Sequence, residues 1–129
     1  MNTRMGWLAM GAAVMLGGSA FAHANAPALR SSALQVDSDG FVFVVNPDSD
    51  SVTRLTPLSS GAQTKQWEAP VGDYPRTLAL VGSFVYTANQ GDDTVSRLAK
   101  ADGTLAGTYA LPAGCSPYGI TGNQKLDRL

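Results

Sequence analysis

Short runs of β-branched and aromatic residues, each bounded by Gly, Asp, Asn or Pro, recur along the chain from about residue 32. Runs of this kind predict β-strands, and no sustained 3.6-residue apolar period occurs outside the N-terminal segment. The pattern therefore predicts an all-β fold of two four-stranded antiparallel up-and-down sheets. The expected strands are residues 32–36, 41–45, 51–56 and 64–69 in the first sheet and 76–81, 84–88, 94–99 and 105–111 in the second.

The two sets of strands are copies of one repeat. The segment from Phe41 to Leu55 recurs from Phe84 to Leu98, 43 residues later, with seven identities in fifteen positions. Four further glycines and prolines return at an offset of 42 residues, Gly61, Pro70, Gly72 and Pro75 as Gly103, Pro112, Gly114 and Pro117. A repeat of this length that contains four strands is typical of a β-propeller blade.

The second copy, Phe84-Val-Tyr-Thr-Ala-Asn-Gln-Gly-Asp-Asp-Thr-Val-Ser96 followed by Gly114-Cys-Ser-Pro117, resembles the YVTN-type β-propeller repeat. Phe41-Val-Phe-Val-Val-Asn46 and Gly72-Asp-Tyr-Pro75 fit the same frame, and the resemblance covers about residues 32–120. It implies an exported seven-bladed propeller of the kind found as surface-layer proteins, lactonase-like proteins or partners of periplasmic redox enzymes. Arg54 and Arg97 stand where that family commonly has an aliphatic residue.

The repeats place a partial β-propeller over residues 27–129, with one blade at about 32–69, a second at about 76–111 and the start of a third at about 117–129. A single blade cannot bury its faces, and a closed ring needs four to eight blades. We therefore expect an incomplete ring, and the preferred hypothesis is a fragment of a longer propeller. The alternative is that several copies assemble into one ring.

Residues 1–24 have the features of a signal peptide, with Arg4 before a small-residue-rich apolar run and A-x-A patterns that end at residues 22 and 24. They predict export to the periplasm or cell surface, with cleavage before His23 or Asn25. An uncleaved membrane anchor is disfavoured because the apolar run is short and has no stop-transfer flank.

Charge and composition exclude several classes of function. With nine basic and ten acidic residues the chain has a net charge of −1, which argues against nucleic acid and, beyond the signal peptide, against a membrane as partner. The only histidine, His23, lies at the cleavage junction, and the only cysteine, Cys115, is expected to be a buried free thiol or to lack its partner. We therefore expect no metal, no cofactor and no catalytic pair.

The best candidate site is the loop that enters the inner strand of each blade, because in the propellers that the chain resembles this loop lies at the mouth of the central channel. It contains Tyr74 and Arg76 in one copy and Ser116 and Tyr118 in the other. A cation and a phenol there would hold an anionic or polar ligand. The simpler interpretation is that these loops only shape the link between blades.

Other motifs favour structural roles. The calcium-like spacing of Asn46, Asp48 and Asp50 lacks a closing glutamate, so these residues are expected to cap a turn. Arg54 and Arg97 are expected to pack through their stems on an exposed or inter-blade face. Trp67 and Tyr109, 42 residues apart, are expected to be equivalent packing residues of the outer strands.

These observations favour a non-catalytic exported propeller module that binds a ligand or a protein. The expected partners are a periplasmic protein or the missing blades. The alternative is the N-terminal piece of a propeller enzyme, lactonase-like, or of a redox partner of a periplasmic cytochrome or dehydrogenase.

Overall fold

The computed structural model describes residues 33–122, so the predicted signal peptide lies outside the described residues. Eight strands fill this region: β1 (Leu34–Val36), β2 (Phe41–Asn46), β3 (Ser51–Pro57), β4 (Lys65–Pro70), β5 (Pro75–Val81), β6 (Phe84–Asn89), β7 (Thr94–Ala99) and β8 (Leu105–Ala110). Two single 3-10 turns, η1 (Pro47–Ser49) and η2 (Leu58–Ser60), follow β2 and β3. Within residues 33–122 no helix is long and apolar enough to cross a membrane.

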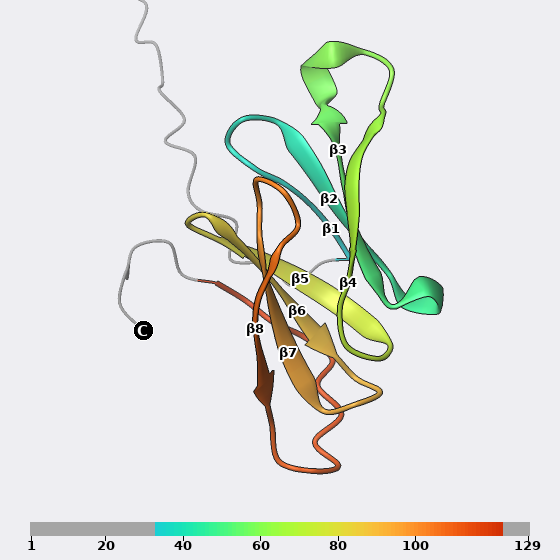
Figure 1. Cartoon of the computed structure of the whole chain (residues 1–129), viewed down its shortest axis with the longest axis vertical. Coiled ribbons are helices and arrows are strands. Elements are labelled where there is room, and N and C mark those ends of the chain that lie inside the picture. Colours follow the sequence, from blue (N-terminus) through green and yellow to red (C-terminus); the bar gives the residue numbers. More distant parts are fainter. Residues whose placement is uncertain (1–32, 123–129) are drawn as a thin grey trace, which may run out of the picture.

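The strands form two four-stranded sheets, each with its strands in sequence order and every neighbouring pair antiparallel. We call β1 to β4 blade 1 and β5 to β8 blade 2 (Figure 1). The prediction of an all-β fold made of up-and-down blades is confirmed, and the described residues form no closed ring. The strands begin and end within two residues of the predicted positions.

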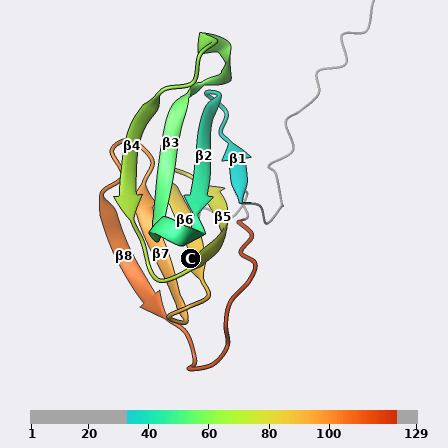
Figure 2. The same cartoon turned by 90° about the vertical axis from the view of Figure 1, so that its right-hand side faces the viewer.

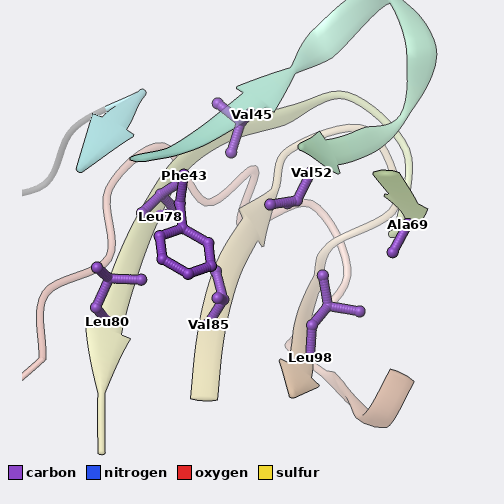
Figure 3. Close-up of a cluster of buried hydrophobic side chains, with 8 residues drawn as sticks. All are labelled: Phe43, Val45, Val52, Ala69, Leu78, Leu80, Val85 and Leu98. Carbon is purple, nitrogen blue, oxygen red and sulfur yellow. The ribbon is translucent and has the colours of Figure 1, made fainter. Parts of the chain in front are cut away.

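The blades pack face to face, as the view along their stacking direction shows (Figure 2). Strand alternation places Phe43, Val45, Val52 and Ala69 of blade 1 on one side of the interface. Leu78, Leu80, Val85 and Leu98 of blade 2 point toward them from the other side (Figure 3). The main apolar core of the described residues therefore lies between the two sheets, so each blade is stabilised by its neighbour.

One asparagine in each blade braces the end of the β2–β3 or β6–β7 hairpin. The amide of Asn89 donates to the hydroxyls of Thr94 at 2.8 Å and Ser96 at 2.9 Å, and its carbonyl oxygen accepts from Thr87 at 2.9 Å. Asn46 makes the same two donations, to Ser51 and Thr53. The asparagine of the repeat motif is thus a structural brace between two strands.

The outer parts of the blades are joined by polar contacts. Arg54 stacks on the ring of Phe41, 3.6 Å from its centroid, and its Nη1 donates to the carbonyl oxygen of Ala101 in blade 2 at 3.0 Å. The indole Nε1 of Trp67 donates to the carbonyl oxygen of Lys100 at 3.2 Å. Arg54 therefore lies on an inter-blade face, as the sequence indicated, and its head group joins the blades.

Trp67 and Tyr109 are not at equivalent positions in their sheets. Trp67 lies opposite Arg54, whereas the residue opposite Arg97 is Gly107, and Tyr109 lies two residues further along β8, opposite Val95. A Cβ on Gly107 would lie 3.4 Å from the Tyr109 hydroxyl, so the tyrosine ring lies back over the glycine. The ring of Tyr109 thereby has the place in blade 2 that the ring of Trp67 has in blade 1, although it starts from a different position of the strand. The prediction that the two residues are equivalent was wrong.

Residues 117–122 continue beyond blade 2 without a strand. The hydroxyl of Thr77 in β5 donates to the carbonyl oxygen of Tyr118 at 3.0 Å and accepts from the N–H of Ile120 at 3.2 Å. A Cβ on Gly122 would clash with the side chain of Val81. This segment, predicted to begin a third blade, therefore runs along β5 on the side of blade 2 away from blade 1.

Candidate ligand site at the blade links

The links that leave the outer strand of each blade, residues 71–74 and 111–116, are anchored by equivalent aspartates. Asp50 Oδ1 accepts the N–H of Tyr74 at 2.8 Å. Asp93, the corresponding residue of blade 2, accepts the N–H groups of Gly114 at 2.6 Å and Ser116 at 2.7 Å. These backbone donors lower the pKa of the Asp93 carboxyl below its usual value, because they stabilise the carboxylate. Each aspartate thus orders the link that follows its blade.

Both links contain a residue with a left-handed backbone at the same place. Tyr74 has a φ of 51° and Ser116 a φ of 43°, a conformation that is uncommon for residues other than Gly, Asn and Asp. Such strain persists only where surrounding contacts determine it, and it is concentrated at functional sites. The aspartate anchors supply those contacts by binding the N–H groups of the same two residues.

Arg76 is the centre of the candidate site. Its guanidinium carbon lies 4.8 Å from the ring centroid of Tyr74 and 4.7 Å from that of Tyr118, both within the range of a cation–π interaction. Its Nε is buried and has no hydrogen-bond partner among residues 33–122. Among residues 33–122 the one ion pair is between Lys65 and Glu68. Within this part of the chain, therefore, no carboxylate forms an ion pair with Arg76.

The structure therefore brings three of the four predicted site residues together. Tyr74 comes from the first link, Arg76 from β5 and Tyr118 from the segment that follows the second link, and both tyrosines are exposed. Ser116 lies apart from these three residues, in the second link at the end of blade 2, where Asp93 binds its N–H. We name Tyr74, Arg76 and Tyr118 the arginine cluster.

Cys115 is exposed in the second link and makes no disulfide, so the first of the two alternatives expected for it, a buried free thiol, was wrong. Its Sγ lies 3.7 Å from Asp93 Oδ1. Desolvation raises the pKa of the thiol above its usual value, and the negative charge of Asp93 adds to this effect. A thiol in this environment is less nucleophilic than an ordinary surface cysteine at neutral pH.

The calcium-like segment is used for other contacts. The amide of Asn46 braces its hairpin and Asp50 binds the link at Tyr74. Among residues 33–122 no group of three or more His, Cys, Asp or Glu side chains is arranged to hold a metal ion. Sequence reasoning expected Asp50 to cap its own hairpin and missed its reach to the next link. The identity of Asp50 and Asp93 in the two repeats was the available signal.

Comparison with known proteins identifies the family. No curated protein matches the chain significantly. The family described as "Lactonase, 7-bladed beta-propeller" matches residues 9–114, which is most of the chain and includes both blades. The blade architecture agrees with that description, and the chain therefore belongs to the seven-bladed β-propeller lactonase family.

Proposed function

We propose that this chain is a non-catalytic propeller module that binds an anionic, hydroxyl-bearing ligand at the arginine cluster. The observation that carries the proposal is the guanidinium of Arg76, which lies beside two exposed phenols and has no described carboxylate partner. Arginine presents several donors in a planar arrangement that matches a carboxylate. The phenol groups of Tyr74 and Tyr118 add donors and acceptors for hydroxyl groups.

The family suggests the chemical class of ligand. A lactone opens on hydrolysis to a hydroxy carboxylate, and a sugar lactone gives a polyhydroxy carboxylate. Such a molecule combines the one negative charge that Arg76 would bind with the hydroxyl groups that the two tyrosines would bind. Gluconate is a simple probe of this class, and myo-inositol is an uncharged control of similar polarity.

Isothermal titration of the purified chain with gluconate and with myo-inositol tests the proposal. Gluconate should bind more tightly than inositol, and Arg76→Gln should weaken gluconate binding by about 10- to 100-fold, since hydrogen bonds to charged groups contribute about 1.5–3 kcal/mol. Lys65→Gln removes one positive charge from an exposed position and should leave binding unchanged. Equal binding of gluconate by the wild type and Arg76→Gln would overturn the proposal.

A second candidate function follows from the family match, namely hydrolysis of a lactone by a propeller to which these blades contribute. In that case Arg76 would stabilise the negative charge that develops on the carbonyl oxygen during attack by water. Hydrolysis of glucono-δ-lactone above the spontaneous rate, lost in Arg76→Gln, would favour the enzyme. Gluconate binding without such an acceleration would favour the binding module.

We further propose that the blades are YVTN-type repeats of an exported protein and that additional blades complete their ring. The motif asparagine is present in both blades, and the family is seven-bladed whereas the described residues form two. The outer face of blade 2 exposes Tyr109. The features of residues 1–24 support a location in the periplasm or at the cell surface. Fusion of residues 1–30 to a reporter that is active only after export would test this location.

A further inference from the structure

The contact between the blades has two complementary parts. Blade 1 supplies an aromatic socket, which we define as Phe41, Phe43, Arg54 and Trp67, and blade 2 supplies the β7–β8 turn at residues 100–103. Arg54 and Trp67 each donate a hydrogen bond to a carbonyl oxygen of this turn. A Cβ added to Gly103 would lie 2.9 Å from the indole of Trp67, so the glycine allows the turn to lie directly against the ring.

A second socket lies on the outer face of blade 2. Phe84, Tyr86 and Arg97 are the repeat equivalents of Phe41, Phe43 and Arg54, and Tyr109 brings its ring over the position that Trp67 has in blade 1. Arg97 again stacks on its aromatic neighbour, with its guanidinium carbon 4.7 Å from the ring centroid of Phe84. Its Nε is buried without a hydrogen-bond partner in the described part of the chain, and Tyr109 remains 43% exposed.

A second turn with its adjoining apolar face lies on the outer side of blade 1. The β3–β4 turn at residues 58–61 corresponds to residues 100–103, and a Cβ on Gly61 would meet no atom within 4 Å. On the same face, Val36 pairs with Val42 as Leu80 pairs with Val85 in blade 2. Leu80 is 8% exposed between the blades, whereas Val36 is 42% exposed. Blade 1 thus repeats the surface with which blade 2 covers it.

We infer that the outer face of blade 2 binds the outer face of blade 1 of a second copy of this chain, with turn 58–61 of that copy in the socket around Arg97. The two faces differ from each other, so the contact joins copies head to tail and each added copy presents a new socket. Residues 118–122 already cover β5 on this side and lie where β1 of the second copy would otherwise pack. The contact therefore uses turn 58–61 of that copy and β6, β7 and β8 of blade 2. The inference does not depend on ligand binding by Arg76.

Two variants that each block one face provide a test. Tyr109→Glu places a charge in the socket, and Leu58→Glu places one in the turn that the socket receives; both residues are exposed at present, so the substitutions need not disturb the core. Ser38→Glu adds the same charge in the β1–β2 turn. The corresponding hairpin turn of blade 2 contains Gly82, at which an added Cβ would meet no atom within 4 Å. The β1–β2 turn is therefore expected to lie outside the contact, and this variant is a matched control.

Light scattering after size exclusion gives the mass of the complexes, and mass spectrometry gives the mass of the processed chain. The wild type and Ser38→Glu should form oligomers whose mass is a whole-number multiple of the mass of the processed chain. Each face variant should be monomeric, because its substitution weakens the affinity between copies by at least about tenfold. An equimolar mixture of Tyr109→Glu and Leu58→Glu should form a 1:1 dimer, because each retains the face that the other has lost.

A monomeric wild type would overturn the inference, as would a mixture of the two variants that stays monomeric. Circular dichroism of each variant verifies that it is folded. If one of them is not folded, Arg97→Gln replaces Tyr109→Glu on the socket and Leu55→Gln replaces Leu58→Glu on the opposite face. A titration with gluconate in parallel separates failure of this inference from failure of the proposed ligand site.

Discussion

Replacing the motif asparagine of each blade by alanine should have very different consequences in the two blades. Asn89 is fully buried beside the inter-blade contact and makes three side-chain hydrogen bonds. Asn46 is only partly buried and makes two. The substitution is the same, and so is the place in the repeat, so the comparison measures the combined effect of burial and of the third hydrogen bond on the brace.

The magnitude follows from the partners that lose a contact. In Asn89→Ala the hydroxyl of Thr87, itself fully buried, loses its acceptor, and an unsatisfied buried donor costs about 1–3 kcal/mol. Ser96 still accepts from the N–H of Gly72 and Thr94 still donates to Asp92, so each of them loses only one contact, about 1 kcal/mol apiece. The expected loss for Asn89→Ala is about 3–5 kcal/mol. For Asn46→Ala, where water can replace the amide, about 1 kcal/mol is expected.

Urea unfolding followed by circular dichroism measures both values. The denaturation midpoint of Asn89→Ala should fall by at least twice as much as that of Asn46→Ala, with the slope unchanged. Where Asn89→Ala does not fold, Thr87→Val removes one hydrogen bond of Asn89 at nearly constant shape. It should cost about 1–3 kcal/mol, because the buried carbonyl oxygen of Asn89 loses its donor. Equal effects at Asn89 and Asn46 would refute the argument, since burial by the neighbouring blade and the hydrogen bond from Thr87 are the differences between them.

Three further results are expected. Gly72→Ala should destabilise by about 1–3 kcal/mol, because its Cβ would lie 2.5 Å from the amide nitrogen of Asn89, whereas Gly107→Ala should be nearly neutral in the same urea assay. Alkylation of Cys115 at pH 8 should be faster in Asp93→Asn, because loss of the carboxylate lowers the raised thiol pKa; an unchanged rate would contradict this. Because the pKa of the Asp93 carboxyl is lowered in the fold, its carboxylate stabilises the fold at pH values above the ordinary carboxyl pKa. This contribution should be lost as the pH falls from that ordinary pKa through the lowered one. Acid unfolding should therefore depend less on pH in Asp93→Asn than in the wild type.

The repeat made most of the fold predictable. Strand positions depend on local alternation and on turn residues, and both are visible in the sequence. Phe43 and Val85 were assigned to strands in this way and are indeed fully buried there. What the repeat could not predict is which face of each blade is covered. Val36 and Leu80 have equivalent pairing but very different exposure, because only Leu80 faces another described blade.

The candidate site was predictable in part for a similar reason. The position after the link proline identified Arg76 and Tyr118, since loops that enter an inner strand recur in every blade. Their approach to one another depends on the path of residues 118–122 along β5, which is a tertiary contact with no local sequence signal. The anchoring role of Asp93 was missed because its partners, Gly114 and Ser116, lie more than twenty residues away.

The mismatch between Trp67 and Tyr109 bears directly on how similar the two sockets are. A repeat alignment at an offset of 42 residues equates them, yet the register of β8 places glycine opposite Arg97 and the tyrosine two residues further along. The glycine leaves room for the tyrosine ring to lie back over it, so an aromatic surface is kept although its residue has moved. The indole of Trp67 donates to a turn carbonyl in the blade 1 socket, and in the inferred contact the phenol of Tyr109 would be the corresponding donor to the turn of the second copy. Tyr109→Phe should therefore retain the aromatic contact and weaken a head-to-tail assembly less than Tyr109→Glu does.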